Sequence, residues 1–356
     1  MRAVHVVGPA EVSDARRPSG GNTYHRMVCA GLERLGWAVH ERLVEGSARA
    51  GTGATLRDSL AGALHGIPDG ELVLLDGLLT ARAAPVVAAH GGRLHLVLLV
   101  HLPHGLETAA GAGADLRAAE RTVLDAVTTV VTTSRWTRDW LVETYAVDPS
   151  RIQVASPGVT SAEPAVPSAS GHRLLCVGAI TPTKGQDVLV EALAEDADLP
   201  WSGRCVGALD VEPGFVDRVL TRGVALGLGE RLTFTGSAPP EAVAAEYADV
   251  DLLVVPSRFE TYGMVITEAL ARAVPVLAAA VGGVPEALGT APDGRRPGLL
   301  VTPAQPAAFA SALREWLTDH DLRDDLRSAA AARRSTLRDW SDTSHTISTV
   351  LSRAAA

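Results

Sequence analysis

Short apolar runs alternate with longer amphipathic stretches along almost the whole chain. The apolar runs are rich in Val, Ile and Leu, which is typical of strands buried on both faces of a parallel sheet. We predict twelve strands, at residues 3–7, 37–40, 72–75, 94–100, 129–133 and 152–155 and at residues 173–178, 204–206, 232–235, 252–255, 276–279 and 299–301.

Helical periodicity fills the stretches between these runs. Predicted helices cover 23–35, 116–126, 136–145 (capped by Ser134), 188–193, 215–226, 241–247, 264–272 and 307–318, with two or three more between 321 and 353. Strands that alternate with helices indicate an α/β fold built on parallel sheets.

A segment rich in proline and small polar residues separates two series of alternating strands and helices. We therefore expect a Rossmann-like domain over 1–160, a linker at 161–171 and a second Rossmann-like domain over 172–338. A last helix within 339–356 is expected to cross back to the first domain. A chain of 356 residues also exceeds the usual size of one core. The predicted fold is thus two doubly wound domains that face each other across a cleft.

Composition narrows the class of protein. Hydrophobic residues make up 47% of the chain and charged residues 21%, which excludes a disordered chain. The net charge of −9 argues against nucleic-acid binding, which needs a basic surface. No apolar run reaches the roughly 20 residues of a membrane span, and the N-terminus shows no signal-peptide pattern. We expect a cytoplasmic protein.

Neither cysteines nor acidic pairs predict a metal. Cys29, Cys176 and Cys205 are widely spaced in apolar surroundings and are interpreted as reduced core residues, and no His/Cys set has zinc spacing. Asp249-Val250-Asp251 imitates the Asp-x-Asp metal motif, but it stands directly before a predicted strand, which favours a role in strand entry. No metal and no cofactor are expected.

The most informative stretch is 256–270. A buried strand ends at Pro256-Ser257, a polar loop carries Glu260, and Gly263 precedes a predicted helix with Glu268 about two turns inside it. Two carboxylates and free backbone N–H groups would converge at the carboxyl end of a strand, where open α/β sheets bind ligands. A diphosphate on the amides, with a sugar hydroxyl on each carboxylate, fits this arrangement. The alternative is two solvated glutamates beside a core helix.

Lysine usage marks a second candidate. Of the 32 basic side chains, 31 are arginine and one is Lys184. Lys184 follows the predicted strand 173–178 at the start of a helix, where a compact, flexible ammonium suits a phosphate. The alternative is an ordinary surface lysine.

Two features of the first half are candidates of the same kind. Gly20-Gly21 opens a helix after the first strand, so the backbone can approach a ligand closely. The G-x-G-x-x-G spacing is absent, so an ordinary turn stays open as an alternative. His101 stands at the carboxyl end of the strand 94–100, where it would contact a sugar or phosphate or else satisfy a backbone carbonyl. His104 and Glu107 are less informative.

Taken together, these residues resemble glycosyltransferase family 4, the retaining glycosyltransferases of GT-B fold, over nearly the whole chain. Glu260 and Glu268 match the family's Glu-x7-Glu signature, and Lys184-Gly185 matches its lysine. Thr235-Gly236 and the turn 282–286 also look like this family.

The resemblance implies a role for each candidate. Catalysis would involve Lys184, Glu260 and His101, with Lys184 on the donor diphosphate and Glu260 on the donor sugar. Glu268 would hold the ribose hydroxyls. The remaining donor-binding candidates are Gly263, Met264, Val265, Gly20, Gly21, Thr235, Gly236 and Arg258.

The chain also departs from the family pattern. Many members have an arginine where this chain has Ala179, and related sequences often place one at Thr183. Arg258, or an arginine of the first domain, would have to replace it.

The implied function is transfer of a sugar, with retention of anomeric configuration, from a nucleoside-diphosphate sugar to a hydroxyl acceptor. We expect a soluble small molecule or an oligosaccharide as acceptor, chosen by loops at 9–20, 46–58 and 104–116. One alternative is a GT-B epimerase or hydrolase, which would need no acceptor. The other is a catalytically silent nucleotide-binding protein. The nucleotide base, the sugar and the oligomeric state stay open.

Overall fold

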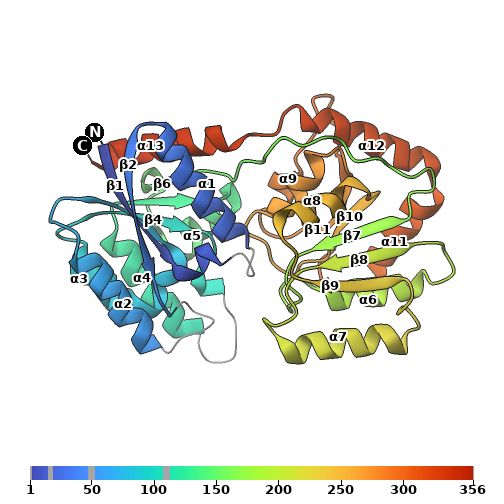
Figure 1. Cartoon of the computed structure of the whole chain (residues 1–356), viewed down its shortest axis with the longest axis horizontal. Helices are drawn as coiled ribbons and strands as arrows, with labels where there is room; N and C mark the ends of the chain where they lie inside the picture. The colour runs from blue at the N-terminus through green and yellow to red at the C-terminus, as the bar shows by residue number, and fades with distance from the viewer. Residues whose placement is uncertain (1, 15–18, 47–52, 107–112, 356) are drawn as a thin grey trace. The chain divides into compact units, whose positions relative to one another are not determined.

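The structure, a computed structural model, describes residues 2–14, 19–46, 53–106 and 113–355. These residues form two compact units (Figure 1). The first unit contains the described residues up to 158 together with 339–355, and the second contains 159–338.

The first unit is built on a six-stranded sheet in which every pairing is parallel. The strand order β2-β1-β3-β4-β5-β6 has β3 and β4 near the centre. The strands are β1 (Arg2–Pro9), β2 (Trp37–Val44), β3 (Leu72–Asp76), β4 (His95–Val100), β5 (Thr129–Thr132) and β6 (Ile152–Val154).

Helices cover this sheet because successive strand residues point to opposite faces and both sets are apolar. One face packs Val73, Leu75 and their neighbours against α2, α3, α4 and α5. The helices are α1 (Gly20–Arg34), α2 (Gly53–His65), α3 (Ala84–His90), α4 (Gly113–Ala126), α5 (Arg135–Tyr145) and α13 (Trp340–Ala354). Short 3-10 helices are η1 (Ala10–Ser13), η2 (Gly77–Leu79), η3 (Ala81–Ala83), η4 (His104–Leu106) and η5 (Pro149–Arg151).

The last helix of the chain, α13, belongs to the first unit and packs on α1 (Figure 1). The packing is close, since a Cβ on Gly31 would lie 1.9 Å from the Ser344 hydroxyl oxygen. The rings of Tyr24 and Trp340 meet edge to face at 5.7 Å. The first unit is therefore assembled from both ends of the chain.

The second unit repeats the plan with a second six-stranded parallel sheet, in the order β12-β11-β10-β7-β8-β9. Since β7 and β10 are neighbours, the loops that follow them lie side by side at the carboxyl edge. The strands are β7 (Arg173–Val177), β8 (Ser202–Val206), β9 (Leu232–Gly236), β10 (Leu252–Val255), β11 (Val276–Ala279) and β12 (Gly298–Val301).

Apolar clusters bury both faces of this sheet. One face packs against α6, α7 and α11, and the other against α8, α9 and α10. The helices are α6 (Gln186–Glu195), α7 (Pro213–Ala225), α8 (Pro240–Ala248), α9 (Met264–Leu270), α10 (Val284–Leu288), α11 (Pro306–Thr318) and α12 (His320–Arg334). In the described parts of the chain, no helix is both long and apolar enough to cross a membrane.

All twelve predicted strands are present, and two Rossmann-like units confirm the predicted fold class. Three helices were not predicted: α2, α3 and α10. The expectation of loops at 46–58 and 104–116 is wrong in part, because α2 begins at Gly53 and α4 at Gly113. Residues 15–18, 47–52 and 107–112, which include Glu107, lie outside the described residues.

Candidate functional site

Glu260 and Lys184 meet at the carboxyl edge of the second sheet. Glu260 is only 8% exposed, in the loop after β10. The Lys184 ammonium donates to its Oε1 at 2.5 Å, and the Ser257 hydroxyl donates to the same oxygen at 3.0 Å. The structure thus brings the two predicted residues into direct contact, and it adds Ser257.

Glycine at position 185 lets the two loops approach. Gly185 adopts φ of 72°, a left-handed conformation that favours glycine, just before α6. A Cβ there would lie 2.2 Å from the carbonyl oxygen of Pro256. The Arg258 N–H also donates to the carbonyl of Thr183 at 2.8 Å. Lys184 is therefore fixed opposite Glu260 by backbone contacts between neighbouring loops.

The turn after β11 supports the Glu260 loop from another side. The N–H of Gly283 donates to the Glu260 carbonyl at 3.0 Å. A Cβ on Gly282 would lie 1.8 Å from that same carbonyl oxygen, and one on Gly283 would lie 2.1 Å from the carbonyl oxygen of Thr261. These contacts give a packing reason for the Gly-Gly pair that the sequence showed at 282–283.

Helix α9 begins right after the Glu260 loop. Gly263, with φ of 94°, precedes it, and Met264 and Val265 are its first residues. N–H groups in the first turn of a helix have no partner within that helix. The prediction that Glu268 lies two turns inside is wrong. Glu268 is the fifth residue from Met264, and one turn takes about 3.6 residues, so it lies little more than one turn in.

Glu268 has few partners for a carboxylate in its position. Its side chain is half-buried and accepts a hydrogen bond from the Tyr247 hydroxyl at 3.3 Å. Burial raises the pKa of Glu268 above its usual value, and Tyr247 and the charge of Arg272 only partly oppose this. The ionised form is therefore incompletely compensated in the free protein.

Arg258 is engaged elsewhere. Its guanidinium binds the Asp187 carboxylate in a bidentate pair, with both distances 2.7 Å, and also donates to the carbonyl of Pro182. The pKa of Arg258 rises because Asp187 stabilises the charged form. As placed, Arg258 stabilises the Lys184 turn. Its suggested role toward a diphosphate stays a prediction, and nothing in the sequence pointed to Asp187.

Three glycines stand at the carboxyl ends of β7, β8 and β9. They are Gly178, Gly207 and Gly236, and a Cβ on Gly207 would lie 2.0 Å from the Gly178 carbonyl oxygen. The Gly207 N–H donates to the Gly236 carbonyl at 3.0 Å. Thr235 donates its hydroxyl to that same carbonyl at 3.1 Å. Gly207 was not predicted, although Cys205-Val206-Gly207-Ala208 repeats the sequence of Cys176-Val177-Gly178-Ala179.

In the first unit, His101 lies at the end of β4 beside Gly21. A Cβ on Gly21 would lie 4.0 Å from the His101 ring, and Gly20 and Gly21 are the first residues of α1. The His101 Nε2 is buried without a hydrogen-bond partner, 3.6 Å from a carboxylate oxygen of Asp76. Burial lowers the pKa of His101, although Asp76 opposes the shift. Asp76 was missed, and its signal is a carboxylate that directly follows a buried strand.

The acidic pair before β10 has structural partners. Asp251 is 1% exposed and accepts hydrogen bonds from Ser168 and from the backbone and guanidinium of Arg173. Asp249 pairs with the same guanidinium. These contacts match the interpretation as strand entry.

Comparison with known proteins places the chain in a family. The model described as "Glycosyl transferases group 1" matches residues 167–333, and the "Glycosyltransferase Family 4" model matches residues 77–163. A D-inositol 3-phosphate glycosyltransferase of Acidothermus cellulolyticus is 30% identical, over 93% of this chain and 85% of that protein. The chain belongs to glycosyltransferase family 4.

Other members of family 4 and solved structures agree. A D-inositol 3-phosphate glycosyltransferase of Catenulispora acidiphila is 30% identical, over 77% of this chain and 70% of that protein. Sucrose-phosphate synthase from Thermosynechococcus elongatus superposes with a TM-score of 0.80 at 20% identity, over 99% of both chains. Anabaena HepE in complex with UDP-glucose gives 0.76 at 20% identity, over 99% of this chain and 100% of that one. The protein is a glycosyltransferase of GT-B fold.

Proposed function

We propose that this enzyme transfers a sugar from a nucleoside-diphosphate sugar to a hydroxyl group of an acceptor, with retention of anomeric configuration. The observation that carries the proposal is the pair of Lys184 and Glu260, held at the carboxyl edge of the second sheet. Open α/β sheets bind ligands at this edge. The pair offers a cation for a diphosphate and a carboxylate for sugar hydroxyls.

Each side chain then has a defined task. The Lys184 ammonium leaves Glu260 for the diphosphate and stabilises the negative charge that grows on the leaving group. Glu260, kept in place by Ser257, accepts hydrogen bonds from hydroxyls of the donor sugar. Glu268 accepts from the ribose hydroxyls, which compensates its ionised form.

The reaction balances without a covalent enzyme intermediate. The bond from the anomeric carbon to the phosphate oxygen breaks, and a bond from that carbon to the acceptor oxygen forms on the same face. The acceptor proton passes to the departing diphosphate. Lys184 lowers the barrier because the charge it faces is larger in the transition state than in the bound donor.

Relatives suggest which substrates to test first. HepE has been solved with UDP-glucose and with UDP and glucose, so a UDP-sugar is the first donor. The Acidothermus relative is named for D-inositol 3-phosphate, so a phosphorylated cyclic polyol is the first acceptor. Small glycosides and oligosaccharides follow.

The test is a thermal-shift titration with UDP, GDP, ADP and dTDP, followed by product analysis with UDP-glucose. We expect one nucleotide to raise the apparent melting temperature in a concentration-dependent way, because a ligand that binds only the folded state stabilises it. Lys184→Ala should lose most of this rise and at least about 100-fold in turnover. Arg222→Ala is the matched control, because it removes an exposed pair with Glu191 in the same unit.

The outcomes separate the alternatives. Sugar release that proceeds equally with and without acceptors would indicate a hydrolase, and conversion of the free nucleotide sugar would indicate an epimerase. Normal turnover in a folded Lys184→Ala variant would refute the assignment of Lys184. A thermal shift with one nucleotide, without product from any donor and acceptor, would favour the catalytically silent nucleotide-binding protein. The absence of a shift with every nucleotide would contradict the proposed donor site.

A further inference from the structure

A cluster of three potential metal ligands lies in the first unit, and none of the three is among the proposed donor-binding residues. His25 and Cys29 stand on α1, and Glu41 stands on β2. One ligand atom from each, a ring nitrogen, the thiol sulfur and a carboxylate oxygen, lies within 4.8 Å of the other two. The His25 Nε2 is 3.0 Å from Glu41 Oε1.

The arrangement follows from secondary structure. Residues four apart on a helix project from the same face, so His25 and Cys29 point the same way. Helix α1 packs against β2, and this packing brings Glu41 to that face. Spacing along the sequence does not reveal such a site, because the third ligand comes from the next strand.

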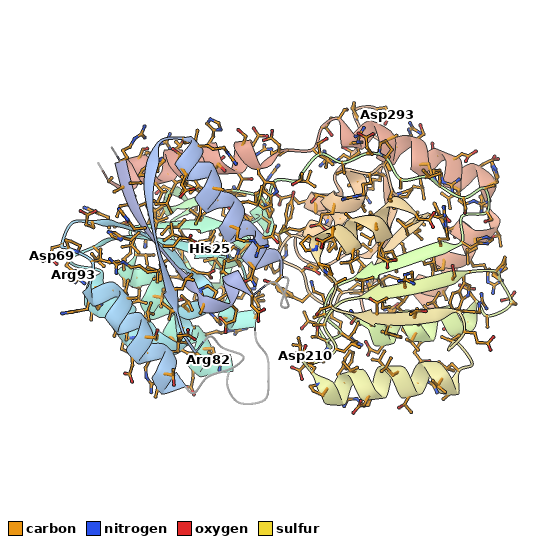
Figure 2. All side chains as sticks on the ribbon, viewed as in Figure 1. His25, Asp69, Arg82, Arg93, Asp210 and Asp293 are labelled. Atoms are coloured by element: carbon orange, nitrogen blue, oxygen red, sulfur yellow. The ribbon has the colours of Figure 1, made fainter. Side chains whose placement is uncertain are left out.

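The site is also held in shape. The His25 side chain is 2% exposed and Cys29 is 6% exposed, whereas the Glu41 side chain is 48% exposed. Two ligands are therefore fixed by the core, and the third faces solvent, from which an ion can enter. Figure 2 shows His25 inside the first unit.

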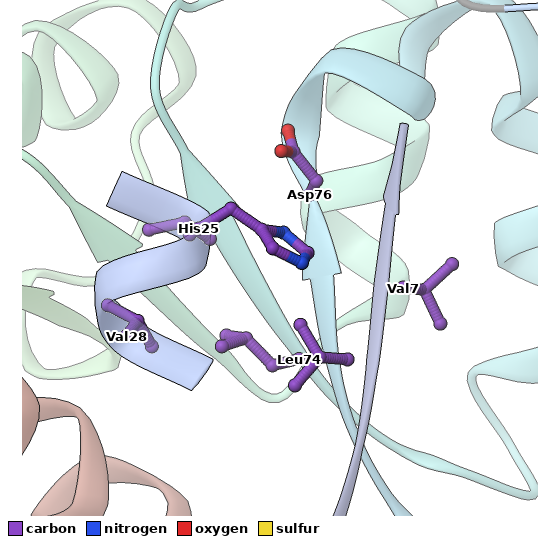
Figure 3. A pocket seen from close by; sticks show the side chains of 7 residues that line it. Val7, His25, Val28, Leu74 and Asp76 are labelled. Carbon is purple, nitrogen blue, oxygen red and sulfur yellow. The ribbon is translucent and has the colours of Figure 1, made fainter. Parts of the chain in front are cut away.

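Gly8 and a small cavity accommodate the imidazole. A Cβ on Gly8 would lie 2.4 Å from a His25 ring carbon. The ring lines a cavity of about 10 Å³ whose wall includes Asp76 (Figure 3), near the smallest volume that holds one water molecule. In metal sites the second ring nitrogen of a ligating histidine usually bonds to a carboxylate or water. Asp76 is the one carboxylate among the residues that line this cavity with His25.

We propose that His25, Cys29 and Glu41 bind a divalent transition-metal ion of the zinc type, with the fourth position left to water. One imidazole, one thiolate and one carboxylate suit zinc, whereas magnesium and calcium take oxygen ligands. Bond lengths of about 2.0–2.3 Å put tetrahedral ligand atoms about 3.5 Å apart, so the three atoms need to move little.

Binding exchanges a proton for a metal bond. A thiol binds a metal ion as its thiolate, so Cys29 must lose its proton when the ion binds. The ion takes the place of that proton, which passes to solvent, and two or more waters leave the ion. The occupied site would join α1 to β2 and stabilise the first unit whatever the outcome for the proposed donor.

The experiment is a Co²⁺ titration of the full-length, reduced protein followed by absorbance. We expect one equivalent to give a thiolate-to-cobalt charge-transfer band in the near ultraviolet, which Zn²⁺ abolishes by displacement. Cys29→Ser should lose this band. Cys205→Ala is the matched control and should keep it, because Cys205 lies in the other unit. Absence of the band from the wild-type protein, or its persistence in Cys29→Ser, would overturn the proposal.

A second variant keeps the test decisive if Cys29→Ser fails to fold. Glu41→Gln changes a side chain that is half exposed, so the protein should fold normally. It should bind Co²⁺ at least about tenfold more weakly than the wild-type protein. Equal affinity would show that Glu41 is not a ligand and would refute the three-residue site.

Discussion

The position of Glu268 lowers the stability of the folded protein when its carboxylate is ionised. Its carboxylate is half-buried, and its side-chain hydrogen bond comes from Tyr247. Burial disfavours the charged form, which is why its pKa is raised. Such perturbed groups concentrate at functional sites, where a ligand supplies the missing partners.

We therefore predict opposite effects of Glu268→Gln on stability and on binding. With a raised pKa, the folded state holds the proton more tightly than the unfolded state, so the wild-type protein loses stability as pH rises above the normal Glu range. Glu268→Gln should melt at a higher temperature than the wild-type protein at pH 7 and at a similar one near pH 4. Its nucleotide-induced rise in melting temperature should disappear. A variant that is less stable at pH 7 would contradict this account.

At the residue scale, the groups that carry charge in the proposed reaction, Lys184 and Glu260, could be predicted from the sequence. The side chains that hold others in place could not, because their roles depend on which strands are neighbours in the sheet. Asp187 engages Arg258 only because the loops after β7 and β10 are adjacent. Ser257 was part of the motif, but its bond to Glu260 depends on the loop conformation.

At the scale of elements, the carboxyl ends of β7, β8 and β9 need small residues. The repeated Cys-Val-Gly sequence in β7 and β8 places two cysteines side by side in the core, Cys176 opposite Cys205, and a glycine two residues after each. Backbone atoms of the two loops then approach at a distance that leaves no space for a side chain at position 207.

Gly207→Ala should therefore be destabilising. The added Cβ would lie 2.0 Å from the Gly178 carbonyl oxygen, so the backbone must move to relieve the overlap. We expect this overpacking to lower the free energy of unfolding by about 3 kcal/mol or more. Gly223→Ala, in α7 with open space around it, should instead leave stability unchanged or raise it by up to about 1 kcal/mol. Urea unfolding of the two variants beside the wild-type protein measures the difference. A tolerated Gly207→Ala would mean that the loops move apart easily.

The predicted elements were correct where apolar runs were continuous, and the helices that were missed are α2, α3 and α10. Helix α2 carries Leu56, Leu60 and Leu64 at intervals of four, all buried, so a signal was present. Helix α3 buries only Ala84 and Val87, and α10 is five residues long. Neither segment therefore shows a clear helical repeat of apolar residues. Tertiary packing, more than local preference, makes these segments helical.

At the scale of the whole molecule, hydrogen bonds to one buried carboxylate, that of Asp251, hold residues 161–171 in place. Residues 161–171 contain neither helix nor strand. Their course is fixed by hydrogen bonds, among them those from the Ser168 backbone and hydroxyl to Asp251. Burial alone would raise the pKa of Asp251, but the bonds from Arg173 and Ser168 outweigh it and the pKa is lowered.

Asp251→Asn should lower the free energy of unfolding by about 2–3 kcal/mol at pH 7, because bonds to a charged acceptor become bonds to a neutral one. A lowered pKa gives stability that is present above the normal Asp range and is lost as pH falls through it. The difference between the variant and the wild-type protein should therefore narrow below about pH 4. Chemical denaturation at pH 7 and pH 3.5 tests this, and an equal difference at both would contradict it.

The division into two α/β units could be predicted from the sequence, because it rests on twelve short apolar runs and a change of composition near residue 160. The cluster of His25, Cys29 and Glu41 could not, since it joins residues of a helix and a strand through their packing. The motifs that resemble family 4 lie mostly in the second unit, whereas this cluster lies in the first.

The contact between Lys184 and Glu260 has a consequence for selectivity. In the free enzyme Lys184 and Glu260 neutralise each other. An inorganic phosphate that bound Lys184 alone would therefore leave the Glu260 carboxylate without a partner. A lone sugar would likewise separate Glu260 from its cation without supplying an anion. Only a molecule that carries an anion and hydroxyl groups at the right separation satisfies both at once. The ion pair therefore favours a substrate in which an anion and hydroxyl groups are joined in one molecule.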